Sequence, residues 1–298
     1  MLIALLIPIG LATVGLTIML FRAVIERRAS PSLEGVILGA ITNFFDALGI
    51  GSFAPSTAWL KFRKLVPDRL IPPTLLVGHG LPTMAEAIIF LVLLGVIVDP
   101  MLLVGCMISI LMGGLLGAPL VSRTRVWIIQ LVVAIALIVA AMAYAATNLH
   151  MMPGGGTASG LPMTLTIVAI VANFIFGILL NYGVGNYAPT LVMLSLMGMD
   201  PRLAFPIMAG GASLVVAGGG ARHIALRQID FRIVIGMTIG GVPAVLIAAL
   251  IVKSMPIETL RWLVIVVVLY AAAVMLREAL LGRKEGADEM PVPAVGAG

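Results

Sequence analysis

Long apolar runs constrain this chain more than any other feature of its sequence. Of its 298 residues, 61% are hydrophobic and only 10% are charged, a composition typical of an integral membrane protein. In lipid, every backbone polar group needs a partner within the protein, so such runs cross the bilayer as helices. Seven runs are long enough to do so, at residues 2–22, 72–96, 101–121, 126–146, 204–221, 233–252 and 259–281. No basic residue precedes the first run, which therefore reads as a retained helix and not a signal peptide.

Two further apolar segments, residues 34–60 and 162–197, are interrupted in the middle by nearly the same motif. The first contains GIGSFAPS at residues 49–56, and the second contains GVGNYAPT at residues 183–190. Prolines beyond the motif keep the same offset, with Pro67 matching Pro201 and Pro72 matching Pro206. A match of this length in constant register indicates an internal duplication.

The shared motif predicts a helix, a break and a second helix. Glycine accepts backbone angles that other residues resist, and proline suits the first turn of a helix better than its interior. We expect a side-chain oxygen of Ser52 or Asn186 to cap the restarting helix. The start of that helix leaves N–H groups unpaired and carries a partial positive charge. Matched broken helices in two halves are typical of the binding site of a secondary transporter.

The distribution of basic residues indicates that both broken segments turn back within the membrane. If both crossed it, the 18 Lys and Arg residues would divide evenly between the two faces. If both turn back, all of them share one face except Arg202, Lys253 and Arg261. The positive-inside rule strongly prefers the second arrangement. A helix over residues 34–48 would also reach only about 22 Å, less than the ~30 Å core.

The predicted fold is an all-α membrane protein with seven spans and two re-entrant hairpins. Each repeat holds one hairpin and three crossings, an odd number, so the repeats are inverted and their hairpin tips should meet near mid-membrane. We expect a multi-pass protein of the cell inner (plasma) membrane, with its N-terminus outside the cell and its C-terminus in the cytoplasm. The predicted parts are an N-terminal helix with a basic loop (1–33), repeat 1 (34–146), a linker (147–161), repeat 2 (162–281) and a disordered cytoplasmic tail (282–298).

At the duplicated breaks, the chain resembles the TauE/SafE family of sulfite-exporter-like permeases, also called the toluene-sulfonate uptake permease family. The likeness covers about residues 34–281 and includes the small-residue patterns Gly113-x-x-x-Gly117 and Gly236-x-x-x-Gly240. It implies transport of small sulfur-containing anions such as sulfite and organosulfonates. The family often carries a glycine triplet at each break, whereas this chain has GSF at 51–53 and GNY at 185–187.

The candidate substrate site is the pair of hairpin tips, where glycines let backbone N–H groups approach an anion and polar side chains donate hydrogen bonds. It comprises Gly49, Gly51, Ser52, Ser56, Gly183, Gly185, Asn186 and Thr190, together with His79 and its repeat counterpart Ser213. A sulfite or sulfonate oxyanion suits such donors, as phosphate does at helix N-termini. The alternative reading is that these glycines only allow tight helix packing.

Three ionisable residues are candidates for coupling transport to protons. His79 can hold a proton near neutral pH, while Glu86 lies seven residues further along the same helix face and Asp46 precedes the first break. The alternative is a structural hydrogen bond or cap for each. Asn43, Asn173 and Asn181 are expected to join helices.

The sequence predicts no enzyme, no catalytic residue, no cofactor, no metal and no nucleic-acid partner, and a homo-oligomer is compatible with it. The net charge of +5 is attributed to basic loops that face the cytoplasm and not to the binding of an acidic partner. Two alternatives are a passive anion channel and a permease for a small carboxylate. A remote third is an intramembrane hydrolase with Ser52 as nucleophile and His79 as base, although no Gly-x-Ser-x-Gly motif is present.

Overall fold

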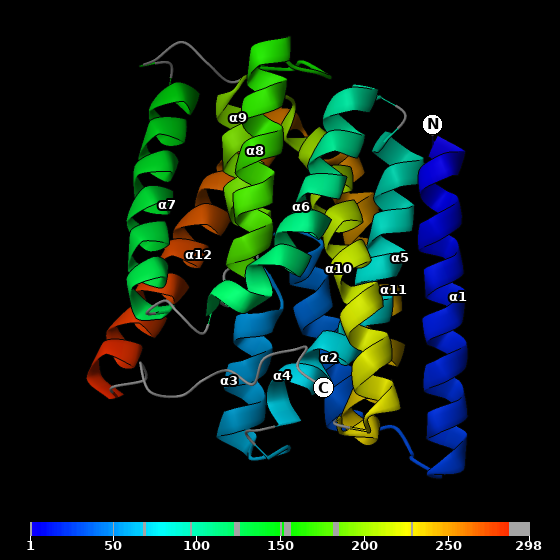
Figure 1. Ribbon diagram of the computed structural model, residues 1–298. Coiled ribbons are helices and arrows are strands. Elements are labelled where there is room, and N and C mark those ends of the chain that lie inside the picture. The colour runs from blue at the N-terminus through cyan, green and yellow to red at the C-terminus, as the bar shows by residue number, and fades with distance from the viewer. Residues whose placement is uncertain are drawn as a thin grey trace. The chain divides into compact units, whose positions relative to one another are not determined.

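The computed structural model of the chain consists of helices, with no named strand among the residues it describes. It describes residues 2–49, 51–67, 70–95, 97–121, 126–149, 151, 156–180, 185–227 and 229–285. The helices, labelled in Figure 1 where space allows, are α1 (Leu2–Glu26), α2 (Leu33–Asp46), α3 (Phe53–Arg63), α4 (Ile71–Gly78), α5 (Gly80–Phe90), the π-helix η2 (Leu91–Gly95), α6 (Pro100–Val121), α7 (Val126–Asn148), α8 (Met163–Leu180), α9 (Tyr187–Leu196), the 3-10 helix η3 (Pro201–Ala204), α10 (Phe205–Ala225), α11 (Phe231–Ser254) and α12 (Ile257–Glu285).

Within the described residues, eight helical stretches are long and apolar enough to cross a membrane. Seven of them coincide with the seven predicted spans, which confirms the all-α membrane fold. The eighth is α8, the first arm of the predicted second hairpin. At the C-terminal end, α12 continues to Glu285, so the first four residues of the predicted tail are helical, and residues 286–298 lie outside the described residues.

One predicted span is less regular than its sequence suggested. The run over residues 72–96 is divided into α4, α5 and η2, and α4 ends just before His79 while α5 begins just after it. Hydrogen bonds from His79 N to Leu75 O and from Thr83 N to His79 O continue across the break. The π-helix that follows accommodates an extra residue in its turn, a feature that is frequent near functional sites.

The first broken segment turns back on itself. Glu34, in the first turn of α2, accepts hydrogen bonds at Oε1 from Trp59 Nε1 at 3.1 Å and from Arg63 Nε at 2.7 Å, both in the last part of α3. The start of α2 and the end of α3 therefore lie together. Two helices of 14 and 11 residues that begin and end at one place form a hairpin and not a crossing.

The second broken segment turns back in the same way. Ala158, just before α8, forms an isolated parallel bridge with Met199, just after α9. Its N–H donates to Gly198 O at 3.3 Å, and its carbonyl accepts from Asp200 N at 3.0 Å. Although α8 is long enough to span a membrane, the chain has returned to the start of α8 by residue 200. We call α2–α3 hairpin 1 and α8–α9 hairpin 2.

The chain divides into two structural units that cut across the sequence repeats. Unit 1 contains residues 1–96 and 212–254. In it, hairpin 1 packs against α11, the helix of the second half that also contacts α4 and α5. The contact is close because glycines face backbone on both sides: a Cβ added to Gly236 would lie 2.7 Å from Ser32 O, and one added to Gly35 would lie 3.1 Å from Ile233 O. The apolar side chains that fix hairpin 1 to α4 and α11 include Leu38, Leu60, Ile71, Leu75 and Met237.

Unit 2 contains residues 97–211 and 255–298 and repeats this pairing. Hairpin 2 packs through α8 against α6, a helix of the first half, and α7 packs against α12. Glycines again face backbone, since a Cβ on Gly113 would meet Phe174 O and one on Gly177 would meet Ile110 O. Each hairpin is thus held by a helix from the other half of the sequence, as small residues allow when two membrane helices pack closely.

Candidate functional site

At the tip of hairpin 1, two glycines hold the turn between α2 and α3. Gly49 and Gly51 have φ values of 94° and 85°, a region that side-chain-bearing residues rarely adopt. A Cβ added to Gly51 would meet no atom within 4 Å among the described residues, so the backbone borders open space there. Ser52 stands at the N-cap position of α3, but its side chain makes no capping hydrogen bond.

The tip of hairpin 2 shows the same features where it is described. Gly183 and Asn181 lie outside the described residues. Gly185 is exposed, and a Cβ added to it would meet no described atom within 4 Å. Asn186 is the N-cap residue of α9, and its side chain makes no capping bond either. Its Nδ2 instead donates to Met208 O at 3.4 Å.

The expectation that Ser52 or Asn186 caps the restarting helix is therefore wrong for the side chains. Both residues stand at the expected N-cap positions, but Asn186 is turned toward α10, and the buried Ser52 hydroxyl lies next to the Asp46 carboxyl group and caps no N–H of α3. The N–H groups of the first turn of α3 and of α9 consequently receive no bond from an N-cap side chain. Such groups, with the partial positive charge of the helix end, are the elements of an anion site.

Behind the tip of hairpin 1, three fully buried side chains form a continuous hydrogen-bonded chain. His79 Nδ1 lies 2.8 Å from Asn43 Oδ1, and His79 Nε2 lies 3.0 Å from Ser56 Oγ. Asn43 Nδ2 donates to Gly39 O at 2.7 Å. The Phe53 ring packs on the imidazole with its centroid 5.3 Å away. The chain joins α2, α3 and the α4–α5 junction, so it ties both arms of hairpin 1 to the next helix.

The partners of Asn43 determine which nitrogen of His79 carries the proton. A carbonyl oxygen only accepts, so the Asn43 atom facing Gly39 O must be the amide nitrogen. Asn43 Oδ1 then faces His79 Nδ1, and this nitrogen must be the N–H donor. In the neutral ring, Nε2 is left as an acceptor, and the Ser56 hydroxyl donates to it.

Hairpin 2 contains a shorter chain without an ionisable member. Thr190, the counterpart of Ser56, donates from Oγ1 directly to Asn173 Oδ1 at 3.0 Å, while Asn173 Nδ2 donates to Ala169 O at 2.8 Å. Each hairpin therefore has an asparagine on its first arm that anchors a hydroxyl on its second arm. The two asparagines join helices, as expected. They do not occupy equivalent positions in the two repeats, so aligning the two halves of the sequence did not reveal their shared role.

The remaining predicted residues are buried in unit 1. Glu86 is fully buried in α5, Asp46 is buried at the end of α2 with its carboxyl group next to Ser52, and Ser213 is buried in α10. Ser56 and Thr190 were predicted to donate hydrogen bonds to an anion, but their hydroxyls already bond to His79 and Asn173. That the residues of the two hairpins hold one anion together stays a prediction from the sequence.

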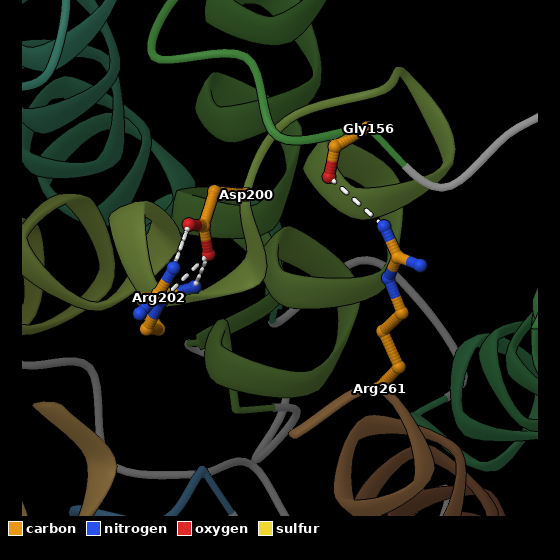
Figure 2. Close-up of polar contacts among 4 residues, drawn as sticks. All are labelled: Gly156, Asp200, Arg202 and Arg261. Atoms are coloured by element: carbon orange, nitrogen blue, oxygen red, sulfur yellow. Dashed lines mark hydrogen bonds and ion pairs between the residues drawn. The ribbon is translucent and has the colours of Figure 1, made fainter. Parts of the chain in front are cut away.

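The base of hairpin 2 is fixed by two arginines, shown in Figure 2. Arg202 binds the Asp200 carboxylate through Nε and Nη2, the shortest contact being 2.6 Å, and its own N–H donates to Asp200 Oδ1 at 2.9 Å. Arg261 of α12 donates from Nη2 to Gly156 O at 3.3 Å. These contacts hold the segment before α8 and the segment after α9 in place, which fixes where hairpin 2 begins and ends.

Long apolar helices together with two hairpins that turn back define a multi-pass α-helical membrane protein. Residues 165–298 match the family model of the sulfite exporter TauE/SafE, which confirms the predicted resemblance over the second half of the chain and supports a membrane transporter. The match begins two residues inside α8 and therefore includes hairpin 2. No curated protein and no solved structure matches the chain.

Proposed function

We propose that this protein is a secondary transporter of a small sulfur-containing anion, sulfite or an organosulfonate. The observation that carries the proposal is the duplicated hairpin tip, at which a helix restarts without a side-chain cap beside a glycine backbone bordering open space. The match of residues 165–298 to the sulfite exporter family supports the choice of a sulfur oxyanion.

The proposed binding groups are the N–H groups that begin α3 and α9, with Ser52 and Asn186 as side-chain donors. An oxyanion presents several acceptor oxygens, which suit converging N–H groups at a helix N-terminus. The nearest basic residues of hairpin 1, Lys61 and Arg63, lie at the far end of α3. Dipoles bind an anion less tightly than a fixed cation does, and a transported anion has to be released.

The Ser56–His79–Asn43 chain has the same order of groups as a hydrolase triad, but transport remains the better proposal. A hydrolase nucleophile needs free N–H groups beside it that stabilise the oxyanion. The N–H of Ser56 itself already donates to Ser52 O at 3.1 Å. The nucleophile suggested by the sequence, Ser52, is not the serine that contacts His79.

The proposal is tested by uptake of radiolabelled sulfite and methanesulfonate into proteoliposomes. Ser52→Ala and Asn186→Ala each remove one donor to a charged group, so we expect the half-saturation concentration to rise about tenfold or more. The matched control is Ser195→Ala, because Ser195 is buried in α9, away from the tip, and its hydroxyl donates to Leu191 O of its own helix. Uptake by both tip variants at the wild-type rate and affinity would show that the tips do not bind the anion.

Competition separates the carboxylate alternative from the sulfur anions. A small carboxylate has two oxygens in a plane, whereas sulfite and sulfonates present three in a pyramid. We expect unlabelled sulfite to inhibit methanesulfonate uptake, with acetate inhibiting only at much higher concentration. Stronger inhibition by acetate would reassign the substrate to a carboxylate while keeping the transporter.

A further inference from the structure

We propose that His79 is the proton-binding site of this transporter and that its protonation turns the Ser56 hydroxyl from a donor to His79 into a donor to the anion. The proposal rests on the proposed function, since it assigns the coupled ion and the coupling residues to an anion site at hairpin 1. Asn43 is the positioning residue, because it fixes which ring nitrogen faces Ser56.

When His79 is neutral, the Ser56 hydroxyl is not available to an anion. Its single proton is donated to His79 Nε2, 3.0 Å away, because the bond between Nδ1 and Asn43 leaves Nε2 as the acceptor. Only the lone pairs of Ser56 Oγ remain, and these repel an anion. In this state the donors of hairpin 1 to an anion are its backbone N–H groups and Ser52, and Ser56 donates no hydrogen bond to the anion.

When a proton binds to Nε2, the direction of the Ser56 hydrogen bond must reverse. The imidazolium has two N–H donors and no acceptor, so Nε2–H donates to Ser56 Oγ and the hydroxyl proton rotates away from the ring. Hairpin 1 then gains one free O–H donor and one positive charge, and both favour an anion. Proton binding and anion binding therefore strengthen each other by the same factor, as linkage requires.

The second hairpin lacks this switch, which makes the coupling one-sided. Thr190 donates to Asn173, an amide that does not change its protonation, and the counterpart of His79 is Ser213. The two hairpins therefore share a hydroxyl anchored through an asparagine, and hairpin 1 alone has an imidazole between the two groups. One such group corresponds to one proton carried with each anion.

Other ionisable groups are carried by the elements packed against His79, and the test has to separate them. Two are buried carboxyl groups, Asp46 at the end of α2 and Glu86 on α5. The others lie toward the ends of α1, α2, α3, α10 and α11, and they are Arg22, Glu26, Glu34, Lys61, Arg63, Arg222, His223, Arg232 and Lys253. Asp46→Asn and Glu86→Gln should keep the pH dependence if His79 is the proton-binding group.

The test measures the half-saturation concentration of radiolabelled methanesulfonate as a function of pH, with equal pH inside and outside the proteoliposomes. Methanesulfonate stays ionised throughout, so any pH dependence belongs to the protein. We expect the half-saturation concentration to fall as the pH is lowered, with a limiting slope of about tenfold per pH unit for one linked proton. His79→Ser, which places the residue of the second repeat here, should abolish the dependence.

Ser56→Ala and Asn43→Asp distinguish the switch from a merely structural role. Ser56→Ala should match wild type at high pH, where the hydroxyl is engaged by His79, and should lose affinity only at low pH. Ser56→Thr, the residue of the second repeat, should keep the full pH response. Asn43→Asp should move the midpoint to higher pH, because a carboxylate stabilises the imidazolium. The control Thr42→Val removes a buried hydroxyl that donates to Leu38 O of its own helix and should leave the profile unchanged.

The outcomes separate the inference from the function on which it rests. Methanesulfonate uptake with the same half-saturation concentration at every pH overturns the inference and leaves the transporter standing. Equal losses in Ser56→Ala at all pH values overturn the switch as well, because they indicate a structural role. Absence of uptake of both sulfite and methanesulfonate at any pH overturns the proposed function and the inference with it.

Discussion

Substituting Gly39 with alanine should separate α2 from α11 and destabilise unit 1. The added Cβ would overlap Met237 O, Cα and C, all of them backbone atoms that cannot move aside as a flexible side chain does. Overpacking of this kind costs about 1–3 kcal/mol. The gain in helix propensity from glycine to alanine returns at most about 1 kcal/mol. The net effect should be a loss of roughly 1–2 kcal/mol.

The assay is thermal unfolding of the purified protein in detergent. The measured quantity is the fraction of protein that remains monodisperse after heating to each temperature. The matched control is Gly15→Ala in α1, where an added Cβ meets no described atom within 4 Å and alanine should be neutral or stabilising. Gly113→Ala, which faces Phe174 O in unit 2, should behave like Gly39→Ala. A Gly39→Ala protein that melts at or above the temperature of Gly15→Ala would refute the proposed close packing.

Three further predictions concern hairpin 1. Nitrogen NMR of labelled protein at high pH should show His79 as the tautomer protonated at Nδ1, and the Nε2-protonated form would contradict the assigned hydrogen bonds. Cysteines replacing Glu34 and Arg63, in a background without the native cysteine, should be joined by a short bifunctional thiol reagent. Failure of the reagent to join them, with each cysteine reactive on its own, would mean that the segment does not turn back. Gly241→Ala should push directly on Asn43, because the new Cβ would lie 2.5 Å from its Nδ2. We expect the pH dependence of uptake to weaken more than the thermal stability, and a purely thermal effect would contradict the role of Asn43.

Much of the fold could be predicted because lipid imposes simple rules. A helix must be about 20 apolar residues long to cross the bilayer, so the seven spans could be located to within a few residues. The two breaks were visible because glycine and proline recur in register, and the charge distribution favoured hairpins. The contacts of Glu34 with Arg63 and of Ala158 with Met199 agree with that reading.

The details that depend on tertiary packing could not be predicted. Ser52 and Asn186 occupy N-cap positions, but whether such a side chain turns back to its own helix depends on neighbours that the local sequence does not contain. Asn186 is turned toward Met208, 22 residues further along the chain. Likewise, the partner of His79 is Ser56 and not Ser52, because one helical turn decides which serine of α3 faces the imidazole.

Counterflow shows whether this protein carries a small sulfur anion on a binding site at its hairpin tips. Proteoliposomes are loaded with unlabelled methanesulfonate, diluted, and supplied with a trace of the labelled anion outside. We expect faster labelled uptake into loaded than into empty vesicles, and a much smaller difference with Ser52→Ala combined with Asn186→Ala. Equal uptake by loaded and empty vesicles, or uptake no greater than into protein-free vesicles, would contradict it.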